Sequence, residues 1–320
     1  MRAGPAYPSR MDEADGGAPI VGVVPNFSEG RRSDVIEAIC AALAVPGARL
    51  VYRQADAEHH RLDTTVLGSG DAVVRSALAG AAVAVERIDL REHRGAHPRI
   101  GAVDVVPFMP VRDVEMQDVV ALAHATGAEL AEQLALPVYL YGEAARSPDR
   151  RSLADVRRGG YEGLRDALAA GERLPDLGPH ELGPAGAVAV GARMPLVAFN
   201  IYLVGDDRAG DDADAAAAIA RTIRESGGGL AAVRAIGFAV PERGAVTVSM
   251  NLVDHTRTGV REAFDAVAAE AAGRGLEVVD SEIVGLVPAD ALSDDDAAHV
   301  RLRGFDPDTQ ILERLLEEDR

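Results

Sequence analysis

Residues 233–252, VRAIGFAVPERGAVTVSMNL, decide the fold because they place two apolar runs on either side of a short turn. The runs Val233–Val240 and Ala245–Leu252 are rich in the β-branched residues that strands favour. The segment Pro241–Gly244 between them has the composition of a tight turn. This stretch therefore predicts a β-hairpin.

The segments that flank the hairpin predict the rest of one layered unit. Before it, Leu196–Val204 is typical of a strand and Asp211–Glu225 of a helix. After it, apolar residues recur at helical spacing at Val260, Phe264, Val267 and Ala271. Leu276–Ile283 then predicts a closing strand. The order β-α-β-β-α-β is that of a split βαβ, or ferredoxin-like, unit.

A similar order is predicted in the first half of the chain. Ser33 is placed to cap a helix that ends near Leu43, and Asp113 to cap another that ends near Leu136. Between them lies a helix over Gly70–Glu86. Strands are predicted at Ile20–Pro25, Arg49–Gln54, Thr64–Leu67, Ile88–Leu90, Gly101–Val106 and Pro137–Tyr141. From Glu143 to Arg193 the pattern weakens, as in a linker or a segment that wraps a ligand.

We therefore predict an α+β protein of two ferredoxin-like (split βαβ) subdomains with a ligand cleft between them. The alternative is one doubly wound α/β sheet. The expected divisions are a disordered tail over residues 1–18, an N-terminal subdomain over 19–192 and a C-terminal subdomain over 193–320.

The composition excludes several classes of protein. All 33 basic residues are Arg, so neither a lysine Schiff base nor a Walker-type loop can form. The formal net charge of −18 makes nucleic acid or an anionic membrane a poor partner. The single cysteine, Cys40, lies in a helical apolar pattern and is expected to be buried. With neither a signal peptide nor a transmembrane stretch, we expect a cytoplasmic protein.

The densest group of chemically active residues is Arg94–Asp104. Pro98 biases His97 toward an extended backbone, so the His97 ring projects from a stiff turn. A histidine held there could act as a general acid or base near neutral pH. The alternative is a histidine that only ties down a loop.

A second group, Asp56–Asp63, lies in a connection between two predicted strands. It is interpreted either as a carboxylate that orients a histidine or as a metal site with His59 and His60. Adjacent histidines point apart on an extended chain, so at most one of them would bind a metal readily.

Two further stretches suit ligand binding. Gly178–Ala187 has little side-chain bulk and could lie against a flat ligand, with Arg193 just beyond it. An ordinary linker is the alternative. Four arginines between Arg150 and Arg158 present groups that suit carboxylates, although a solvated face explains them equally well.

Several motifs together resemble the glutamate formimidoyltransferase (formiminotransferase) family, in its monofunctional form without a cyclodeaminase domain. They occur in the family's order and span most of the chain. The matching segments are Val24–Gly30 (VPNFSEG), His97–Phe108 (HPRIGAVDVVPF), Val138–Ala145 (VYLYGEAA), Gly191–Arg193 with Ala198–Asn200, Ser249–Leu252 and Val284–Pro288.

This resemblance implies a homodimeric enzyme of histidine catabolism with a folate cleft between two ferredoxin-like subdomains. The reaction would move a formimino group from N-formiminoglutamate to N5 of tetrahydrofolate as co-substrate, with no metal. His97 matches the catalytic histidine and Asp56 an active-site carboxylate. One imidazole could take the proton from N5 and return one to the departing nitrogen, while an ionised Asp56 would stabilise the cationic formamidinium group.

The resemblance also implies binding residues. The folate-contacting stretch is Gly178–Gly186, with Gly178, Pro179, Leu182, Pro184 and Gly186 as its contact residues. The expected substrate-binding residues are Asn26, Arg99, Glu143 and Arg193.

The chain departs from the family pattern around the same cleft. His60 and Leu62 replace an amide and a hydroxyl residue, Gly183 replaces a histidine, and Tyr202 replaces an asparagine. A different formimino donor or acceptor is therefore an alternative. Two others are a metal-assisted amidohydrolase that uses His59, His97 and Asp56, and a non-catalytic folate-binding protein.

Overall fold

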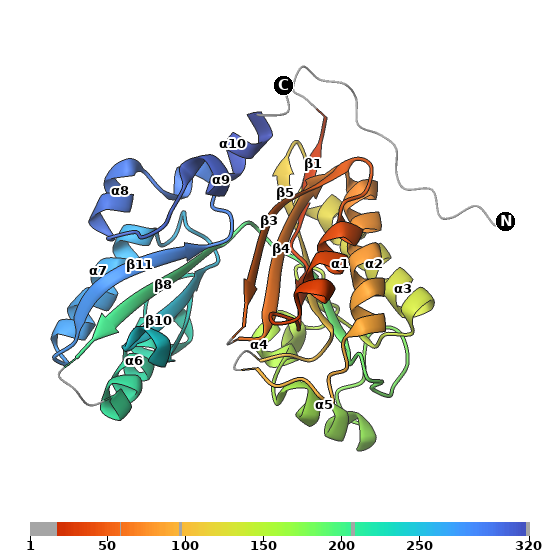
Figure 1. Cartoon of the computed structure of the whole chain (residues 1–320), viewed down its shortest axis with the longest axis horizontal. Helices are drawn as coiled ribbons and strands as arrows, with labels where there is room; N and C mark the ends of the chain where they lie inside the picture. The colour runs from red at the N-terminus through yellow and green to blue at the C-terminus, as the bar shows by residue number, and fades with distance from the viewer. Residues whose placement is uncertain (1–17, 58, 96–97, 206–208, 318–320) are drawn as a thin grey trace.

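A computed structural model describes residues 18–57, 59–95, 98–205 and 209–317, and within them it contains two β-sheets with helices packed on them (Figure 1). This confirms the mixed α+β class. The alternative of one doubly wound sheet is wrong, because no strand pairing joins the two sheets within the described ranges.

The first sheet is mixed and has seven strands in the order β1-β4-β2-β5-β7-β6, with β3 paired on β4. Its strands are β1 (Ile20–Val23), β2 (Asn26–Phe27), β3 (Ala48–Asp56), β4 (Arg61–Gly68), β5 (Val103–Arg112), β6 (Val138–Gly142) and β7 (Val188–Ala192). The helices of this half are α1 (Ser33–Leu43), α2 (Gly70–Arg87), α3 (Met116–Leu134), α4 (Leu153–Val156) and α5 (Gly160–Ala169), with a 3₁₀ turn η1 (Pro148–Arg150).

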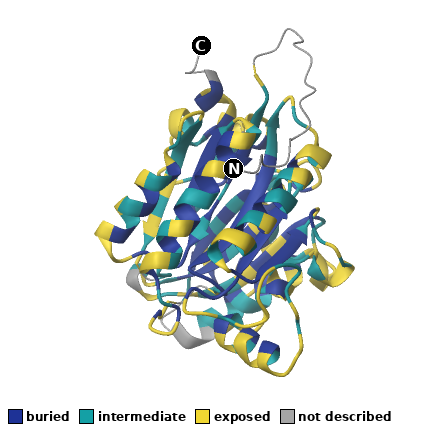
Figure 2. Ribbon diagram, turned by 90° about the vertical axis from the view of Figure 1, so that its right-hand side faces the viewer, coloured by how far each residue is buried: buried dark blue, intermediate teal, exposed yellow. Residues whose placement is uncertain are grey.

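Helices α1, α2 and α3 cover one face of this sheet, and Figure 2 shows their exposed outer sides over the buried strands. The apolar spacing of α1 explains its packing, because Val35, Ile39 and Leu43 are buried together with Cys40. Helices α4 and α5 cover part of the opposite face, where Tyr139, Tyr141 and Leu164 belong to a second buried cluster.

The second sheet is antiparallel, in the order β11-β8-β10-β9. Its strands are β8 (Val197–Val204), β9 (Val233–Val240), β10 (Ala245–Leu252) and β11 (Glu277–Val284). The remaining elements are α6 (Ala209–Ile223), α7 (Val260–Ala272), α8 (Asp294–His299), α9 (Pro307–Gln310) and α10 (Leu312–Glu317), with 3₁₀ turns η2 (Glu225–Gly227), η3 (Pro241–Arg243) and η4 (Ala289–Ala291).

The predicted hairpin is confirmed. Strands β9 and β10 pair antiparallel from Val233↔Leu252 to Val240↔Ala245, and Gly244 closes the turn with φ +58°. From β8 to β11 the element order is β-α-β-β-α-β, as the sequence pattern indicates. The ferredoxin-like description of both halves and the proposed domain boundaries stay predictions.

Several local predictions are wrong. The segment Ile88–Leu90 forms no strand and instead anchors a loop, where the Leu90 N–H donates to the carbonyl of Pro184 at 2.8 Å. Ser33 lies inside α1, after its N-cap Arg32. Asp113 precedes the capping box that Glu115 forms with Asp118.

The weakly patterned stretch before Arg193 is not a plain linker. It contains α4, α5 and the strand β7, which lies parallel between β5 and β6. All five residues of β7 are buried, so its sequence lacks the alternation that marks a half-exposed strand.

The two halves contact each other through the end of the chain. Leu312 and Leu316 of α10 pack against Leu67 and Met109 of the first sheet. Arg49 of β3 donates to the carbonyl of Leu315.

Candidate functional site

Polar side chains gather at the end of the first sheet where β3 and β4 meet. Asp56 ends β3, Arg61 begins β4, and Asn26 lies opposite Asp63 in the β2–β4 pairing. Asp104, the second residue of β5, comes from the motif after His97. Residues far apart in the sequence are thus brought to one edge of the sheet.

An arginine cluster occupies the centre of this group, and we define it as Arg61, Asp104 and Arg157. Arg61 donates to Asp104 Oδ2 at 2.8 Å and to Asn26 Oδ1 at 2.7 Å. Arg157, which follows α4, donates to the same Asp104 Oδ2. Burial alone would raise the pKa of Asp104, but Arg157, Arg61 and the Ile100 N–H lower it to about 2, so this carboxylate is ionised.

A histidine cluster lies beside it, which we define as Glu29, His60 and His93. Glu29 is fully buried and accepts from the backbone N–H groups of Arg31 and Arg32, both at 2.9 Å. Burial pushes the pKa of Glu29 up, but these bonds and the Arg32 ion pair lower it more, so its pKa lies below the usual value.

His60 joins this carboxylate to the loop that carries the central motif. Its Nε2 lies 3.1 Å from Glu29 Oε1 and its Nδ1 3.1 Å from the Arg94 carbonyl oxygen. Its ring stacks on that of His93 with centroids 4.2 Å apart. Burial lowers the pKa of His93 to about 4, so His93 is neutral at pH 7.

Asp56 and His59 form a pair that faces the second half. Asp56 Oδ2 lies 2.7 Å from His59 Nδ1, and Asp56 Oδ1 accepts from the His59 backbone N–H at 2.8 Å. The His59 ring meets the ring of Phe238 on β9 edge to face, with centroids 6.0 Å apart. The interpretation of Asp56 as a carboxylate that orients a histidine thus has a matching geometry.

The glycine-rich stretch lies against the central motif. The Ala187 N–H donates to the Ile100 carbonyl at 2.9 Å, and the Ala102 N–H to the Ala185 carbonyl at 2.8 Å. Gly186 has φ +72°, and a Cβ there would lie 2.2 Å from the Ile100 carbonyl oxygen. Only glycine therefore fits that position.

The exposed part of the stretch contains most of the predicted folate contacts. Gly178, Pro179 and Pro184 are exposed, and Leu182 is partly buried against the core. Gly178 has φ +85° and lies close to the Leu136 carbonyl oxygen. At Gly178, Pro179 and Pro184 the backbone of this stretch is therefore exposed with little side-chain cover.

The predicted substrate-binding residues lie in different surroundings. The Arg99 guanidinium donates two hydrogen bonds of 2.8 Å to the Glu162 carboxylate and one of 3.1 Å to His93 Nδ1. The Glu143 side chain is exposed at the end of β6. Arg193 follows β7, and its Nη1 donates to the Met194 carbonyl at 3.0 Å.

His97 and its neighbour Ala96 lie outside the described residues. On the N-terminal side of these two residues, Gly95 packs against His59 and His60. A Cβ on Gly95 would lie 2.5 Å from the His59 carbonyl oxygen. The described end of this loop at Gly95 is thus close to both histidines of the Asp56–Asp63 segment.

Each of the four residues that depart from the family pattern has defined surroundings in the structure. His60 has two hydrogen-bond partners, and Leu62 is fully buried in the core. The Gly183 carbonyl accepts from the Gly186 N–H at 3.0 Å. The Tyr202 hydroxyl donates to Glu282 at 2.8 Å beneath the Arg243 guanidinium.

Sequence reasoning assigned no role to Arg61, Glu29 or His93. Glu29 was within a recognised motif, and its bonds to the N–H groups of Arg31 and Arg32 could have been expected from an acidic residue before a helix. The pairing of Arg61 with Asp104 spans 43 positions and left no local signal.

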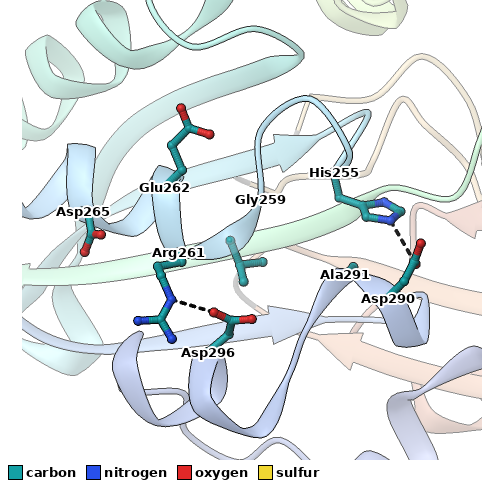
Figure 3. Close-up of a pocket in the computed structure, with 9 residues that line it drawn as sticks. His255, Gly259, Arg261, Glu262, Asp265, Asp290, Ala291 and Asp296 are labelled. Atoms are coloured by element: carbon teal, nitrogen blue, oxygen red, sulfur yellow. Dashed lines mark hydrogen bonds and ion pairs between the residues drawn. The ribbon is translucent and has the colours of Figure 1, made fainter.

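Two hollows lie outside this group. One, of about 500 Å³, opens between β3 and β11 and is lined by Tyr52, Gln54, Glu282 and Arg303 among others. The other, of about 530 Å³, lies in the second half beside the start of α7, where His255 pairs with Asp290 and Arg261 with Asp296 (Figure 3). It contains none of the predicted site residues.

Among the described residues, no group of three His, Cys, Asp or Glu side chains is arranged to hold a metal ion. The proposed third ligand of the metal alternative, His97, is not among them. Searched over the same residues, no helix is long and apolar enough to cross a membrane.

Comparisons with known proteins bear on this geometry. The family model described as "Formiminotransferase domain, N-terminal subdomain" matches residues 20–193, and the one described as "Formiminotransferase domain" matches residues 198–313. A glutamate formimidoyltransferase of Streptococcus pyogenes serotype M1 is 39% identical over 301 residues, which cover 93% of this chain and 99% of the relative.

Two other relatives extend the comparison. A glutamate formimidoyltransferase of Thermoplasma acidophilum is 40% identical over 93% of this chain and 97% of the relative. A formimidoyltransferase-cyclodeaminase of Rattus norvegicus is 42% identical over 86% of this chain but only 51% of the relative.

Proposed function

Because the chain belongs to the formiminotransferase family, we propose that it moves a formimino group from N-formiminoglutamate to N5 of tetrahydrofolate, giving 5-formiminotetrahydrofolate and glutamate. The family resemblance drawn from the motifs is thereby confirmed. The observation that carries the proposal is the Asp56–His59 pair, because His59 lies against Gly95 of the first half and against Phe238 of the second.

The residues present fit a folate co-substrate. The stretch Gly178–Gly186 offers backbone groups with little side-chain bulk, so a flat ring system could approach it closely. Tetrahydrofolate would supply the N5 nucleophile. In this proposal Asn26, Arg99, Glu143 and Arg193 remain the substrate-binding residues.

Asp56 would act through its charge. The formimino group is a cationic amidine when protonated, and an ionised carboxylate beside it stabilises that charge more strongly than water does. Asp56 Oδ1 accepts from the His59 backbone N–H and Oδ2 lies 2.7 Å from His59 Nδ1, so the carboxylate is held in one orientation.

Two histidines are candidates for the proton transfer. His97 takes this role by resemblance to the family. The bond from His59 Nδ1 to Asp56 places the ring proton on Nδ1 and makes Nε2 the basic nitrogen of His59. We propose His97 as the general acid and base, and His59 as the residue that keeps Asp56 oriented.

An assay of the full chain tests the reaction and this division of roles. Tetrahydrofolate and N-formiminoglutamate are mixed with the protein, and the change in folate absorbance is followed. Wild type is expected to turn over, and His97→Ala to lose about 10²–10⁴-fold in kcat, the usual contribution of a general acid or base. His59→Gln is expected to lose less.

The controls separate chemistry from folding. His299→Ala removes an imidazole from the second half, where His299 pairs with Asp265, and should leave turnover unchanged. Circular dichroism checks that each variant is folded. Equal rates for wild type and His97→Ala would contradict the assigned role of His97.

Two results would favour the alternatives. Folate binding without any turnover would indicate a binding protein. A stoichiometric transition metal in the purified protein, lost together with activity in Asp56→Asn and His59→Gln, would indicate a metal-assisted hydrolase. A cytoplasmic location and a homodimer also belong to this proposal, and light scattering of the purified protein tests the second.

A further inference from the structure

The connection between β3 and β4 is packed against two other segments of the first half. From the segment before α1, Gly30 approaches so closely that a Cβ there would lie 2.0 Å from the Asp56 carbonyl oxygen. From the loop after α2, a Cβ on Gly95 would lie 2.7 Å from the Cβ of His60. Both ends of this connection are therefore held by backbone that only glycine allows to come so near.

His60 has an unusual backbone in this connection. Its φ is +52°, in the left-handed region that residues with a Cβ seldom adopt. Such a conformation persists where the surrounding contacts impose it, and it often occurs at functional sites. The side chain of His60 is only 14% exposed, so its own contacts are the first to consider.

Both ring nitrogens of His60 face hydrogen-bond acceptors. Nε2 lies 3.1 Å from Glu29 Oε1, and Nδ1 lies 3.1 Å from the Arg94 carbonyl oxygen. The carbonyl has no proton to give, and Glu29 is ionised because it accepts from the N–H groups of Arg31 and Arg32. A neutral imidazole has one N–H and can satisfy one of these acceptors, whereas an imidazolium has two and satisfies both.

His93, whose ring stacks on that of His60 at 4.2 Å between centroids, has the opposite arrangement. Its Nδ1 accepts from Arg99 Nε at 3.1 Å, because a guanidinium can only donate. Its Nε2 therefore carries the ring proton and donates to the His60 carbonyl at 3.1 Å. One donor and one acceptor suit a neutral ring. The charges that face the two rings come from Glu29 with its partner Arg32 and from Arg99.

We propose that His60 is held as an imidazolium and is the positioning residue of the connection that presents the Asp56–His59 pair. This inference rests on the proposed function, in which Asp56 stabilises the cationic formimino group. With both protons in place, His60 joins the buried Glu29 to the backbone of the loop after α2. Loss of these bonds would let the connection shift, and the Asp56 carboxylate would shift with it.

NMR of the full chain labelled with ¹⁵N-histidine reads the protonation state directly. At pH 7 we expect both ring nitrogens of His60 to have the shifts of protonated nitrogens, and His93 to have one protonated and one unprotonated nitrogen. Spectra of His60→Asn and His93→Gln assign the signals by their disappearance. Glu29→Gln removes the anion, so His60 should become neutral. A wild-type His60 ring with one unprotonated nitrogen at pH 7 would overturn the proposal.

Turnover tests the positioning role. His60→Phe keeps a ring that can stack on His93 but has no N–H donor, and we expect kcat to fall by about tenfold or more, since small misplacements of a catalytic group are costly. His60→Asn supplies an amide donor for the Arg94 carbonyl and should restore turnover to within about threefold of wild type. His255→Phe is the matched control and should leave turnover unchanged, because His255 is 15% exposed and pairs with Asp290 in the second half.

Folding is checked by circular dichroism for each variant. If His60→Phe does not fold, His60→Gly removes the same donors and adopts the left-handed backbone without strain, so it should show the same loss of kcat. A folded variant that lacks both donors and keeps the wild-type kcat would overturn the positioning role. A folded His60→Asn variant as slow as His60→Phe would overturn it too.

These outcomes are separable from that of the proposed function. A wild-type protein that transfers no formimino group refutes the function, while the NMR spectra still decide whether His60 is an imidazolium. A wild-type protein that turns over as proposed, with a His60→Phe variant equally fast, refutes the positioning role alone.

Discussion

Glu29 and Asp104 are both completely buried carboxylates, yet they are held in opposite ways. Glu29 is bound mainly by its sequence neighbours, through the N–H groups of Arg31 and Arg32 and the Arg32 side chain. Asp104 is bound by arginines 43 and 53 positions away. One carboxylate thus organises a local turn, whereas the other joins separate segments of the fold.

The two surroundings also differ in how they respond to pH. The Glu29 carboxylate contacts His60, which stacks on His93, and burial lowers the pKa of His93 to about 4, so this cluster takes up a proton in mildly acidic solution. Among the described residues, Asp104 contacts guanidinium groups and a backbone N–H, which do not titrate in that range. The arginine cluster is therefore a fixed charge array, and the histidine cluster an adjustable one.

The largest effect is expected from Asp104→Asn, which removes the charge of the carboxylate that joins separate segments of the fold. Removing the charge leaves Arg61 and Arg157 buried without their shared anion. Breaking a buried ion pair in this way costs about 3–5 kcal/mol in the free energy of unfolding. Urea denaturation should show a lower midpoint, and Asp63→Asn, at the partly exposed end of Arg61, should lose less. A loss below that of Asp63→Asn would contradict the shared-anion role.

The next effect sharpens the difference in pH response. His93 has a pKa of about 4 in the fold and about 6.5 when unfolded, so the unfolded chain binds the proton more readily. Its contribution is complete above pH 6.5 and is lost as the pH falls toward 4, amounting to about 3 kcal/mol at most. The pKa of Asp104 is also lowered, to about 2, so its contribution disappears only below about pH 4.

Stability measured by urea denaturation between pH 7 and pH 4 checks this order. Wild type should lose stability through that window, and His93→Gln should lose much less of it. Asp104→Asn should keep the wild-type slope above pH 4. A His93→Gln variant with the full wild-type slope would show that another group is responsible.

A smaller effect is expected when the local carboxylate is neutralised. Glu29→Gln keeps one acceptor oxygen for the backbone N–H groups but removes the charge that faces Arg32 and His60. We expect a loss of about 1–3 kcal/mol, the usual cost of a weakened charged hydrogen bond. Thermal unfolding measures it, and Glu37→Gln, in an exposed ion pair with Arg53, is the control.

The smallest effect is expected from His60→Asn, which restores the amide residue of the family pattern. An amide can replace one hydrogen bond of His60 but not the ring stacking on His93. We expect stability to fall by no more than about 1 kcal/mol, and turnover to stay within about threefold of wild type. A large loss of turnover would mean that His60 acts on substrate directly.

The sequence also predicted some parts of this molecule better than others. Half-exposed strands and amphipathic helices carry their period in the chain, so β9, β10 and α7 lie where the apolar spacing places them. The fully buried β7 has no alternation, so the Glu143–Arg193 stretch that contains it has the pattern of a linker or of a segment that wraps a ligand. Pattern reasoning therefore works where one face of an element meets water.

For the site, the residue order alone determined the family and indicated that a carboxylate in the segment Asp56–Asp63 could orient a histidine, because these residues are only a few positions apart. Only the tertiary structure decided that Arg61 and Arg157 share Asp104, and that Arg99 is engaged by Glu162. Such pairings join strands and helices more than forty positions apart, and their geometry depends on sheet order, which side-chain type does not encode.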